Sequence, residues 1–316
     1  MSLPNVSSNP HIRSGATTQL IMFTVLLALM PAFGYGIYNF GPRALAVALV
    51  CVGSCVISEL IFDLIAHKKI RVSDLSACVT GLLLALNLPV SIPFWQAALG
   101  SVFAIIVVKE LFGGLGKNFM NPALAARCFL LISFPVSMTN FDTDIYTGAT
   151  PLAILKSGEQ VDVSAMIHGS IPGTIGETSM VMILIGAIIL LLTGVIDLWV
   201  PGSYILSFII FMLLFGGHGA DPAFIAAHLA GGGLMLGAFF MATDYVTRPV
   251  SRKGQVVFGI FLGLMTCIFR VFGPSAEGVS YAIILGNCIV PLIDKFTVPV
   301  PFGLTASEFK KGGKRS

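Results

Sequence analysis

The segment DIYTGATPL, which begins at Asp144, contains the most specific arrangement of reactive side chains in the chain. Gly148 and Ala149 leave one side of Thr150 uncrowded. Pro151 disfavours helical backbone at the preceding residue and therefore favours an extended conformation at Thr150. The pattern predicts a small, accessible hydroxyl near an acid, Asp144. A hydroxyl in this setting is a candidate for covalent modification by another enzyme.

A second interpretation of the same segment needs no chemistry. Asp144 and Thr147 have side chains that commonly cap turns and helix N-termini, and proline is favoured at the first position of a helix. The segment would then be a capped turn followed by a short helix that begins at Pro151. The spacing alone leaves both interpretations open and favours the turn.

Two further segments place a proline after a capping residue, namely NPA at Asn121 and DPA at Asp221. The simplest interpretation is that each is an ordinary helix N-terminus. The functional interpretation is that helix ends at membrane depth bind ligands or ions. Asn121 is therefore a candidate ligand contact as well as a candidate N-cap.

Several ionisable residues lie inside apolar stretches, where they are functional candidates by default. Glu59 and Asp63 are four residues apart, so they share a helix face and are candidates for lining an ion path. Lys109 and Arg127 lie near helix ends. We expect their long side chains to reach the membrane surface, and the alternative for Arg127 is to pair with Glu110 or to contact a ligand.

The composition indicates the environment that must position these residues. The chain has 316 residues, of which 56% are hydrophobic and 10% charged, and its mean hydropathy is +0.93. Soluble domains carry about 25% charged residues, so we expect one domain over residues 1–316 embedded in the bilayer. The polar start, Met1–Ala16, lacks the apolar core of a cleavable signal peptide. The six cysteines lack paired metal-site spacing, and no metal centre is predicted.

A helix needs about 20 apolar residues to cross a hydrocarbon core of about 30 Å. On this criterion the sequence predicts an all-α integral membrane protein with about ten transmembrane helices. The predicted spans are Thr18–Phe40, Arg43–Ala66, Val72–Leu88, Pro93–Phe112, Pro122–Met138, Ser179–Trp199, Ser203–Phe215, Pro222–Ala242, Gly254–Phe272 and Gly278–Lys295.

The third and eighth predicted spans contain similar sequences, TGLLLALNLP at Thr80–Pro89 and GGLMLGAFF at Gly232–Phe240. An offset of five spans reverses the orientation of the second copy. The similarity therefore predicts two inverted five-helix repeats.

The distribution of Lys and Arg sets the orientation. With the N-terminus inside, thirteen of the 18 basic residues lie at inner ends. Both termini are then expected in the cytoplasm, which requires an even number of spans. The long connection 139–178 lies on the outer face, and its five acids and one base give a net charge of −4. Long connections between otherwise short ones are usually functional or disordered.

Five segments carry a resemblance to a known family. They are DIYTGATPLA from Asp144, SNPHIRS at Ser8–Ser14, GKNFMNPALAAR at Gly116–Arg127, MATDYVTRP at Met241–Pro249, and Glu277–Asp294. Together they resemble the family that unites the D subunit of the Rnf ion-translocating oxidoreductase with the B subunit of the sodium-pumping NADH:quinone reductase. The B subunits carry a longer N-terminal region than this chain, so the resemblance favours the Rnf branch.

In that family the last Thr of an Asp-x-x-(Ser/Thr)-Gly-Ala-Thr motif bears FMN through a phosphoester bond, which a dedicated flavin transferase installs. The resemblance implies that Thr150 is the attachment residue of a covalent FMN. It also implies that Asp144, Thr147, Gly148 and Ala149 complete the flavin-binding motif. The outer connection 139–178 would then carry the flavin site.

The resemblance has further implications. A non-covalent riboflavin is expected nearer the cytoplasm, with Asn121 as a candidate contact. The chain would be a multi-pass subunit in the bacterial inner membrane and would have no catalytic residues of its own. The complex would be a translocase that couples electron transfer between reduced ferredoxin and NAD to Na⁺ or H⁺ movement. Its expected partners are the A, B, C, E and G subunits of the Rnf complex, the flavin transferase and the lipid bilayer, with no nucleic acid.

Two other classes of function remain open. The inverted repeat would also suit a solute channel or transporter without a redox role, in which residues 139–178 form a lid. A purely structural scaffold is the third class. The sequence has no nicotinamide-binding fingerprint, so electrons would have to enter and leave through partner subunits. The feature that separates these classes is the Thr150 hydroxyl, because only a flavin-bearing subunit needs it.

Overall fold

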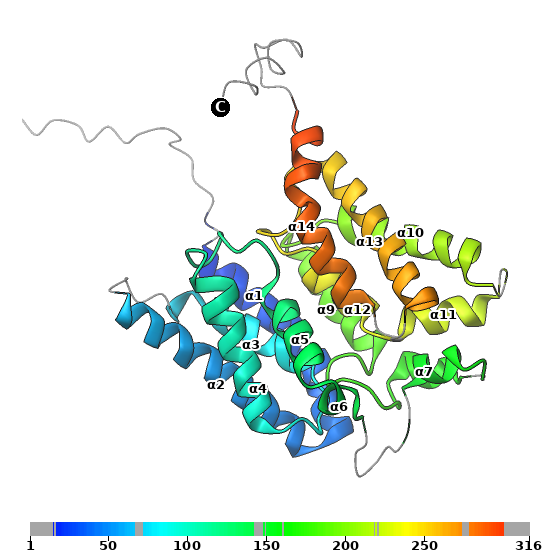
Figure 1. Ribbon diagram of the computed structural model, residues 1–316, viewed down its shortest axis with the longest axis horizontal. Coiled ribbons are helices and arrows are strands. Elements are labelled where there is room, and N and C mark those ends of the chain that lie inside the picture. The colour runs from blue at the N-terminus through cyan, green and yellow to red at the C-terminus, as the bar shows by residue number, and fades with distance from the viewer. Residues whose placement is uncertain are drawn as a thin grey trace, which may run out of the picture.

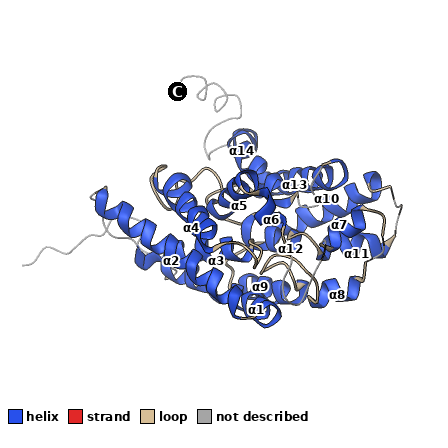
Figure 2. Cartoon of the chain, turned by 60° about the horizontal axis from the view of Figure 1, so that its bottom comes forward, coloured by secondary structure: helices blue, strands red, loops and turns tan. Residues whose placement is uncertain are grey.

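The computed structural model describes residues 15, 17–66, 72–141, 148, 150–159, 161–217, 219, 221–273 and 278–299. Figure 2 shows helices joined by loops, and no strand occurs in these ranges. The predicted all-α class is therefore confirmed for this part of the chain.

The helices follow one another in three groups along the chain. The first group is α1 (Thr18–Phe40), α2 (Pro42–Ile65), the 3-10 helix η1 (Val72–Asp74), α3 (Ser76–Leu86), α4 (Phe94–Val102), the π-helix η2 (Phe103–Glu110), α5 (Pro122–Ser133) and α6 (Pro135–Thr139). Two short helices follow, α7 (Pro151–Lys156) and α8 (Val163–His168). The last group is α9 (Met180–Leu192), α10 (Trp199–Phe215), α11 (Pro222–Ala230), α12 (Leu234–Leu236), the π-helix η3 (Gly237–Met241), α13 (Arg252–Phe272) and α14 (Val279–Thr297).

Helices from the two ends of the chain occupy different sides of the molecule. Figure 1 shows α2 to α5 gathered on one side and α10, α11, α13 and α14 on the other. Helix α1 packs along α9 and so joins the two sides, while α10 packs along α13 over much of its length. Gly186 lies at the first of these contacts and Gly259 and Gly263 at the second. Small residues are what allow membrane helices to approach this closely.

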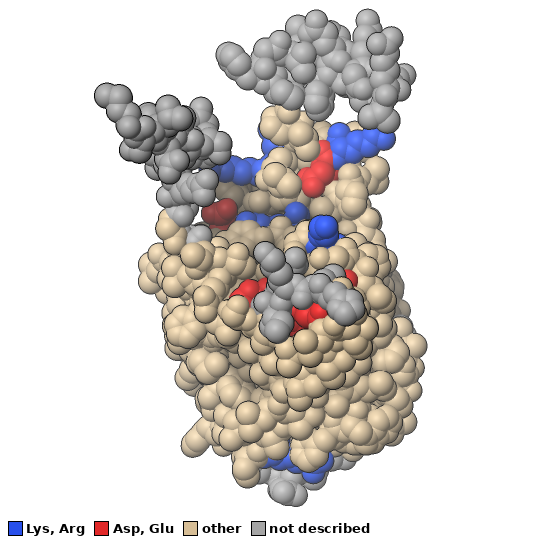
Figure 3. Space-filling model, turned by 90° about the vertical axis from the view of Figure 1, so that its left-hand side faces the viewer, with Lys and Arg blue, Asp and Glu red and all other residues tan. Residues whose placement is uncertain are grey.

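Four helices in the described ranges are long and apolar enough to cross a membrane, namely α1, α2, α13 and α14. Only 22% to 44% of the residues in their apolar windows are buried, so more than half of the residues in each window are at least partly exposed. Figure 3 shows the side of the molecule on which α2 lies, where a broad region without charged side chains separates charged groups towards the two ends. A surface of this kind identifies a multi-pass membrane protein.

The remaining predicted spans contain shorter or broken helices. The predicted span Pro122–Met138 divides into α5 and α6 at Pro135, where proline removes a backbone donor. The predicted span Pro222–Ala242 breaks at Gly231–Gly233, with a bend of 62° between its two helical parts. Gly232 and Gly233 adopt φ of +64° and +66°, which glycine tolerates best. The count of about ten spans stays a prediction.

The connection 139–178 differs from the polar outer loop that we expected. Its last part turns into the helix bundle, where the Gly176 amide donates to the Leu86 carbonyl at 2.8 Å and the Ile175 amide to the Leu88 carbonyl at 3.1 Å. Ile175 and Glu177 are buried. Glu177 therefore does not contribute to an acidic outer surface, because its carboxylate lies among helices.

Candidate functional site

Thr150 occupies the N-cap position of α7, with φ −63° and ψ 150°. This is the extended backbone that the following Pro151 predicts, and Pro151 also begins the short helix of the alternative interpretation. Thr150 differs from an ordinary N-cap because its side chain makes no capping hydrogen bond. The half-buried hydroxyl is therefore available for another bond.

The rest of the motif is only partly described. Gly148 is exposed and has φ of +120°, a left-handed conformation that favours glycine. Asp144, Thr147 and Ala149 lie outside the described residues, so their predicted roles, in the flavin motif or as turn caps, stay predictions.

A small pocket adjoins Thr150, and we call it the Thr150 pocket. Its walls include Leu152, Met166, Glu177 and Gly232. These residues come from α7, α8, the buried end of the connection 139–178, and the bend between α11 and α12. Segments far apart in the sequence therefore meet beside the candidate hydroxyl.

Glu177, which lines this pocket, belongs to a buried ion pair. Arg127 on α5 donates from Nη1 to Glu177 Oε1 at 2.9 Å and to Asn87 Oδ1 at 2.9 Å. Each side chain of the ion pair is 5% exposed. The expectation that Arg127 reaches the membrane surface is therefore wrong. A carboxylate offsets part of the cost of burying a guanidinium charge, and Glu177 supplies it here. Nothing in the sequence indicated this partner, because charge counting assigned Glu177 to an exposed acidic loop.

A second buried arginine fixes the bend between α11 and α12. Arg270 on α13 donates to the carbonyls of His228, Gly231 and Gly232, the last two at 2.9 and 3.2 Å. These carbonyls lie in the last turn of α11 or just beyond its end at Ala230, and the C-terminal end of a helix carries partial negative charge. Arg270 therefore satisfies backbone acceptors that have no partner within their own helix, and holds the broken helix in place.

A separate cavity of about 100 Å³ opens between α1, α3 and η3, and we call it the α1–α3–η3 cavity. Its polar wall includes Asn118, Asn121, Thr243 and Asp244, and apolar residues such as Phe240 complete it. Asn121 Oδ1 accepts hydrogen bonds from the amides of the first turn of α5, so the N-cap interpretation is confirmed. Asn121 also faces this cavity, and its role as a ligand contact stays a prediction.

Asp244 adds an acidic group to the same cavity. Burial raises the pKa of the Asp244 carboxyl, and hydrogen bonds from the Val246 amide and the Thr247 hydroxyl, together with the charge of Arg248, oppose that rise. These amide, hydroxyl and carboxyl groups form a polar edge beside apolar walls, an arrangement common to small-molecule sites.

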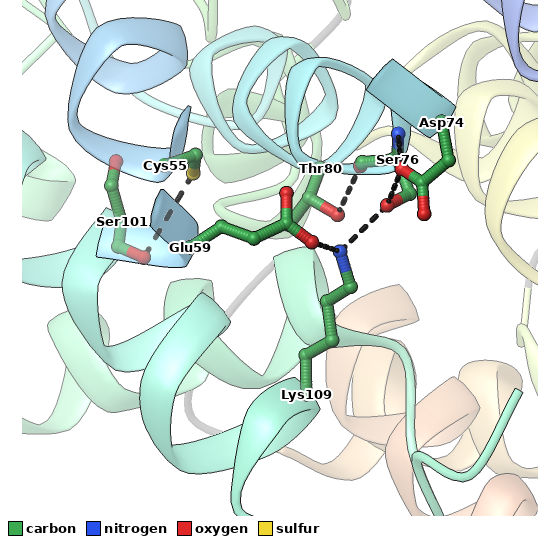
Figure 4. Close-up of polar contacts among 7 residues, drawn as sticks. All are labelled: Cys55, Glu59, Asp74, Ser76, Thr80, Ser101 and Lys109. Carbon is green, nitrogen blue, oxygen red and sulfur yellow. Dashed lines mark hydrogen bonds and ion pairs between the residues drawn. The ribbon is translucent and has the colours of Figure 1, made fainter. Parts of the chain in front are cut away.

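A further buried cluster surrounds Glu59 on α2 (Figure 4). Lys109 Nζ on η2 lies 2.5 Å from Glu59 Oε1 and 2.6 Å from Ser76 Oγ, and Ser76 Oγ donates to Asp74 Oδ1 at 2.5 Å. The expectation that Lys109 reaches the membrane surface is wrong, because Lys109 is 3% exposed. Asp63 is also buried. The sequence did contain a signal for the ion pair, since two opposite charges inside apolar spans are expected to pair.

The other candidate side chains are explained by local structure. Asp221 caps α11 by accepting from the Ala223 amide at 2.9 Å. Cys51, Cys55, Cys128 and Cys267 are buried free thiols. Among the described residues, no three His, Cys, Asp or Glu side chains come together in a way that could hold a metal ion.

Comparison with known proteins identifies relatives over nearly the whole chain. The chain is 47% identical to the D subunit of the Na⁺-translocating ferredoxin:NAD⁺ oxidoreductase complex of Acetobacterium woodii, with 98% of each chain covered. It is 40% identical to the D subunit of the proton-translocating ferredoxin:NAD⁺ oxidoreductase complex of Clostridium ljungdahlii, over 94% of this chain and 96% of that one. It is 34% identical to the B subunit of the Na⁺-translocating NADH-quinone reductase of Chromohalobacter salexigens, over 94% and 86%.

The model of the NQR2, RnfD, RnfE family matches residues 5–303. This range covers both sides of the helix bundle, the Thr150 pocket and the α1–α3–η3 cavity. On this coverage and these identities, the chain belongs to the NQR2, RnfD, RnfE family.

Proposed function

We propose that this chain is the FMN-bearing membrane subunit of an Rnf-type complex, which couples electron transfer between ferredoxin and NAD to Na⁺ or H⁺ translocation. The observation that carries the flavin assignment is the Thr150 hydroxyl, which sits at an N-cap and makes no capping bond. The named relatives supply the class of complex, since two are D subunits of ferredoxin:NAD⁺ oxidoreductases. A transporter or a scaffold has no need of this hydroxyl.

The residues around Thr150 fit a tethered cofactor. A phosphoester at its Oγ would hold FMN, a carrier of one or two electrons, without the need for tight non-covalent binding. Pro151 keeps the hydroxyl on extended backbone ahead of α7, and Lys156 donates from Nζ to the Gly273 carbonyl at the end of α13. These contacts fix the attachment point relative to the spanning helices. Electrons would enter and leave through the other Rnf subunits, and a flavin transferase would install the group.

The membrane arrangement that accompanies this function is ten spans in two inverted five-helix repeats, with both termini in the cytoplasm of a bacterial inner membrane. Three of the shorter apolar helices, α3, α5 and α9, lie where the sequence predicts spans. The two similar sequences at Thr80–Pro89 and Gly232–Phe240 each lie beside a helix end, the first where α3 ends at Leu86 and the second just after α11 ends at Ala230. Interrupted helices are common in transporter folds built from inverted repeats.

The α1–α3–η3 cavity is the second proposed flavin site. Asn118 and Asn121 lie on one part of its wall and Thr243 and Asp244 on another. These groups offer both donors and acceptors to the edge of a riboflavin ring held without a covalent bond. The cavity would place this flavin nearer the cytoplasm than Thr150.

Replacing Thr150 with Val should abolish covalent flavin. The chain is expressed with its flavin transferase, denatured and examined for in-gel flavin fluorescence. Fluorescence should be present in the wild type, absent in Thr150→Val, and retained in Thr147→Val, because only the Thr150 hydroxyl is expected to form the phosphoester. The second proposed site, the α1–α3–η3 cavity, is tested by chromatography of the small molecules that are released on denaturation. Riboflavin is the expected species.

A wild-type band without fluorescence would overturn the covalent assignment. Fluorescence that persists in Thr150→Val and disappears in Thr147→Val would move the attachment to the other threonine. Release of no flavin from the purified wild-type complex would remove the proposal for the α1–α3–η3 cavity and leave the Thr150 assignment intact.

The orientation is tested at Glu159, an exposed residue of the connection 139–178. The thiol introduced by Glu159→Cys should react with a membrane-impermeant reagent in intact cells, because the positive charges at the opposite ends of the helices retain those ends inside. The matched control is Lys253→Cys, at the expected inner end of α13, which should react only after lysis. The reverse pattern would overturn the orientation.

A further inference from the structure

The segment that carries Thr150 rests on the bend between α11 and α12. A Cβ built on Gly232 would overlap Leu152 Cδ1, so the glycine leaves the space that Leu152 occupies. A Cβ built on Gly233 would likewise overlap the Glu177 carboxylate. Leu152 and Glu177 therefore both pack on this short run of glycines, which separates the Thr150 segment from the centre of the bundle.

Glu177 is itself held from the centre of the bundle. Its Oε1 lies 2.9 Å from Arg127 Nη1, and the same nitrogen lies 2.9 Å from the oxygen of Asn87, which ends α3. The backbone beside Glu177 is anchored as well, since the Gly176 amide donates to the Leu86 carbonyl at 2.8 Å. A continuous series of contacts thus joins α3 and α5, through Glu177 and the glycines, to the segment that carries Thr150.

We propose that Glu177 is a positioning residue for the outer flavin: paired with Arg127, it fixes the glycine bend under the Thr150 segment and keeps the pocket wall electrically neutral. The inference rests on the proposed attachment of FMN at Thr150. Both charges of the pair are shielded from water, so the loss of one leaves the other almost unscreened beside the pocket. Charge near a flavin tunes its reduction potential.

The position of the segment can be measured without the flavin. In a background carrying Cys288→Ser, the thiol introduced by Thr150→Cys should react with a membrane-impermeant maleimide at a rate set by how firmly the segment is held. Glu177→Gln should raise that rate several-fold. Glu159→Gln, which changes an exposed acid of the same connection, should leave it unchanged.

The second measurement is the midpoint potential of the covalent flavin in the assembled complex with Thr150 intact. Glu177→Gln should shift the potential upward, because the remaining Arg127 charge favours the negatively charged reduced flavin. The double variant Arg127→Gln/Glu177→Gln removes both charges. Its potential should return towards that of the wild type, while maleimide labelling in the corresponding Thr150→Cys background stays fast. A merely structural role would not make the potential follow the charge in this way.

Equal labelling rates and equal potentials in Glu177→Gln and Glu159→Gln would overturn the inference. If the unpaired Arg127 prevents Glu177→Gln from folding, Arg127→Gln/Glu177→Gln replaces it in the labelling experiment. A labelling rate in this double variant no higher than that of the parent Thr150→Cys protein would overturn the inference. Failure of the proposed function gives a different pattern. In that case even the wild type shows no covalent flavin to titrate, whereas the labelling comparison still reports whether Glu177 holds the segment.

Discussion

The Lys109→Met variant should unfold with a free energy about 3–5 kcal/mol below that of the wild type, the usual cost of breaking a buried ion pair. Lys109 Nζ lies 2.5 Å from Glu59 Oε1, and the two side chains are 4% and 2% exposed. Removing the amine leaves the Glu59 carboxylate without its counter-charge and Ser76 Oγ without its Nζ partner. Thermal unfolding in detergent should show a fall in Tm on the order of 10 °C.

Two variants make this experiment specific to the buried pair. Glu59→Gln/Lys109→Met removes both charges and should recover most of the lost stability, because a neutral pair of similar volume has no ionic desolvation to compensate. Lys117→Met changes an exposed lysine that follows the same π-helix, and it should stay within about 0.5 kcal/mol of the wild type. A Lys109→Met protein as stable as Lys117→Met would contradict the buried ion pair.

The sequence predicted the helices well wherever one apolar run forms one helix. The predicted span Thr18–Phe40 coincides with α1 at both ends, and Arg43–Ala66 differs from α2 by one residue at each end. Hydrophobic length and flanking breakers suffice there, because each run is long enough to cross the hydrocarbon core as one helix. The interruptions at Pro135 and Gly231–Gly233 were harder to predict, since glycine and proline often occur in unbroken membrane helices and packing decides where they bend.

The candidate site was predictable only in part. Extended backbone at Thr150 and the capping role of Asn121 are local properties, and both are confirmed. The partners of Lys109 and Arg127 are not local, because they lie 50 residues away along the chain. Charge counting placed Glu177 on the outer surface. Only the three-dimensional path of its segment shows that it is an internal counter-ion.

Gly186→Ala should destabilise the contact between α1 and α9 by about 1–3 kcal/mol, the range for overpacking a tight interface. A Cβ at this position would overlap the Ala28 carbonyl oxygen and lie 2.9 Å from Phe240 Cζ. The carbonyl belongs to the backbone of α1, so no side-chain rotation can relieve the clash, and the two helices must separate. Thermal unfolding in detergent measures the effect.

Gly202→Ala is the matched control for this substitution. Gly202 lies in α10 with no atom within 4 Å of an added Cβ, so the extra methyl group should be neutral or stabilise the helix by up to about 1 kcal/mol. Equal unfolding temperatures for the two variants would contradict the close α1–α9 contact. The contact also bears on the proposed riboflavin site, because Phe240 lines the α1–α3–η3 cavity. If that proposal holds and α1 and α9 separate as expected, Gly186→Ala should retain less non-covalent flavin than Gly202→Ala, while the proposed covalent flavin at Thr150 is unaffected in both.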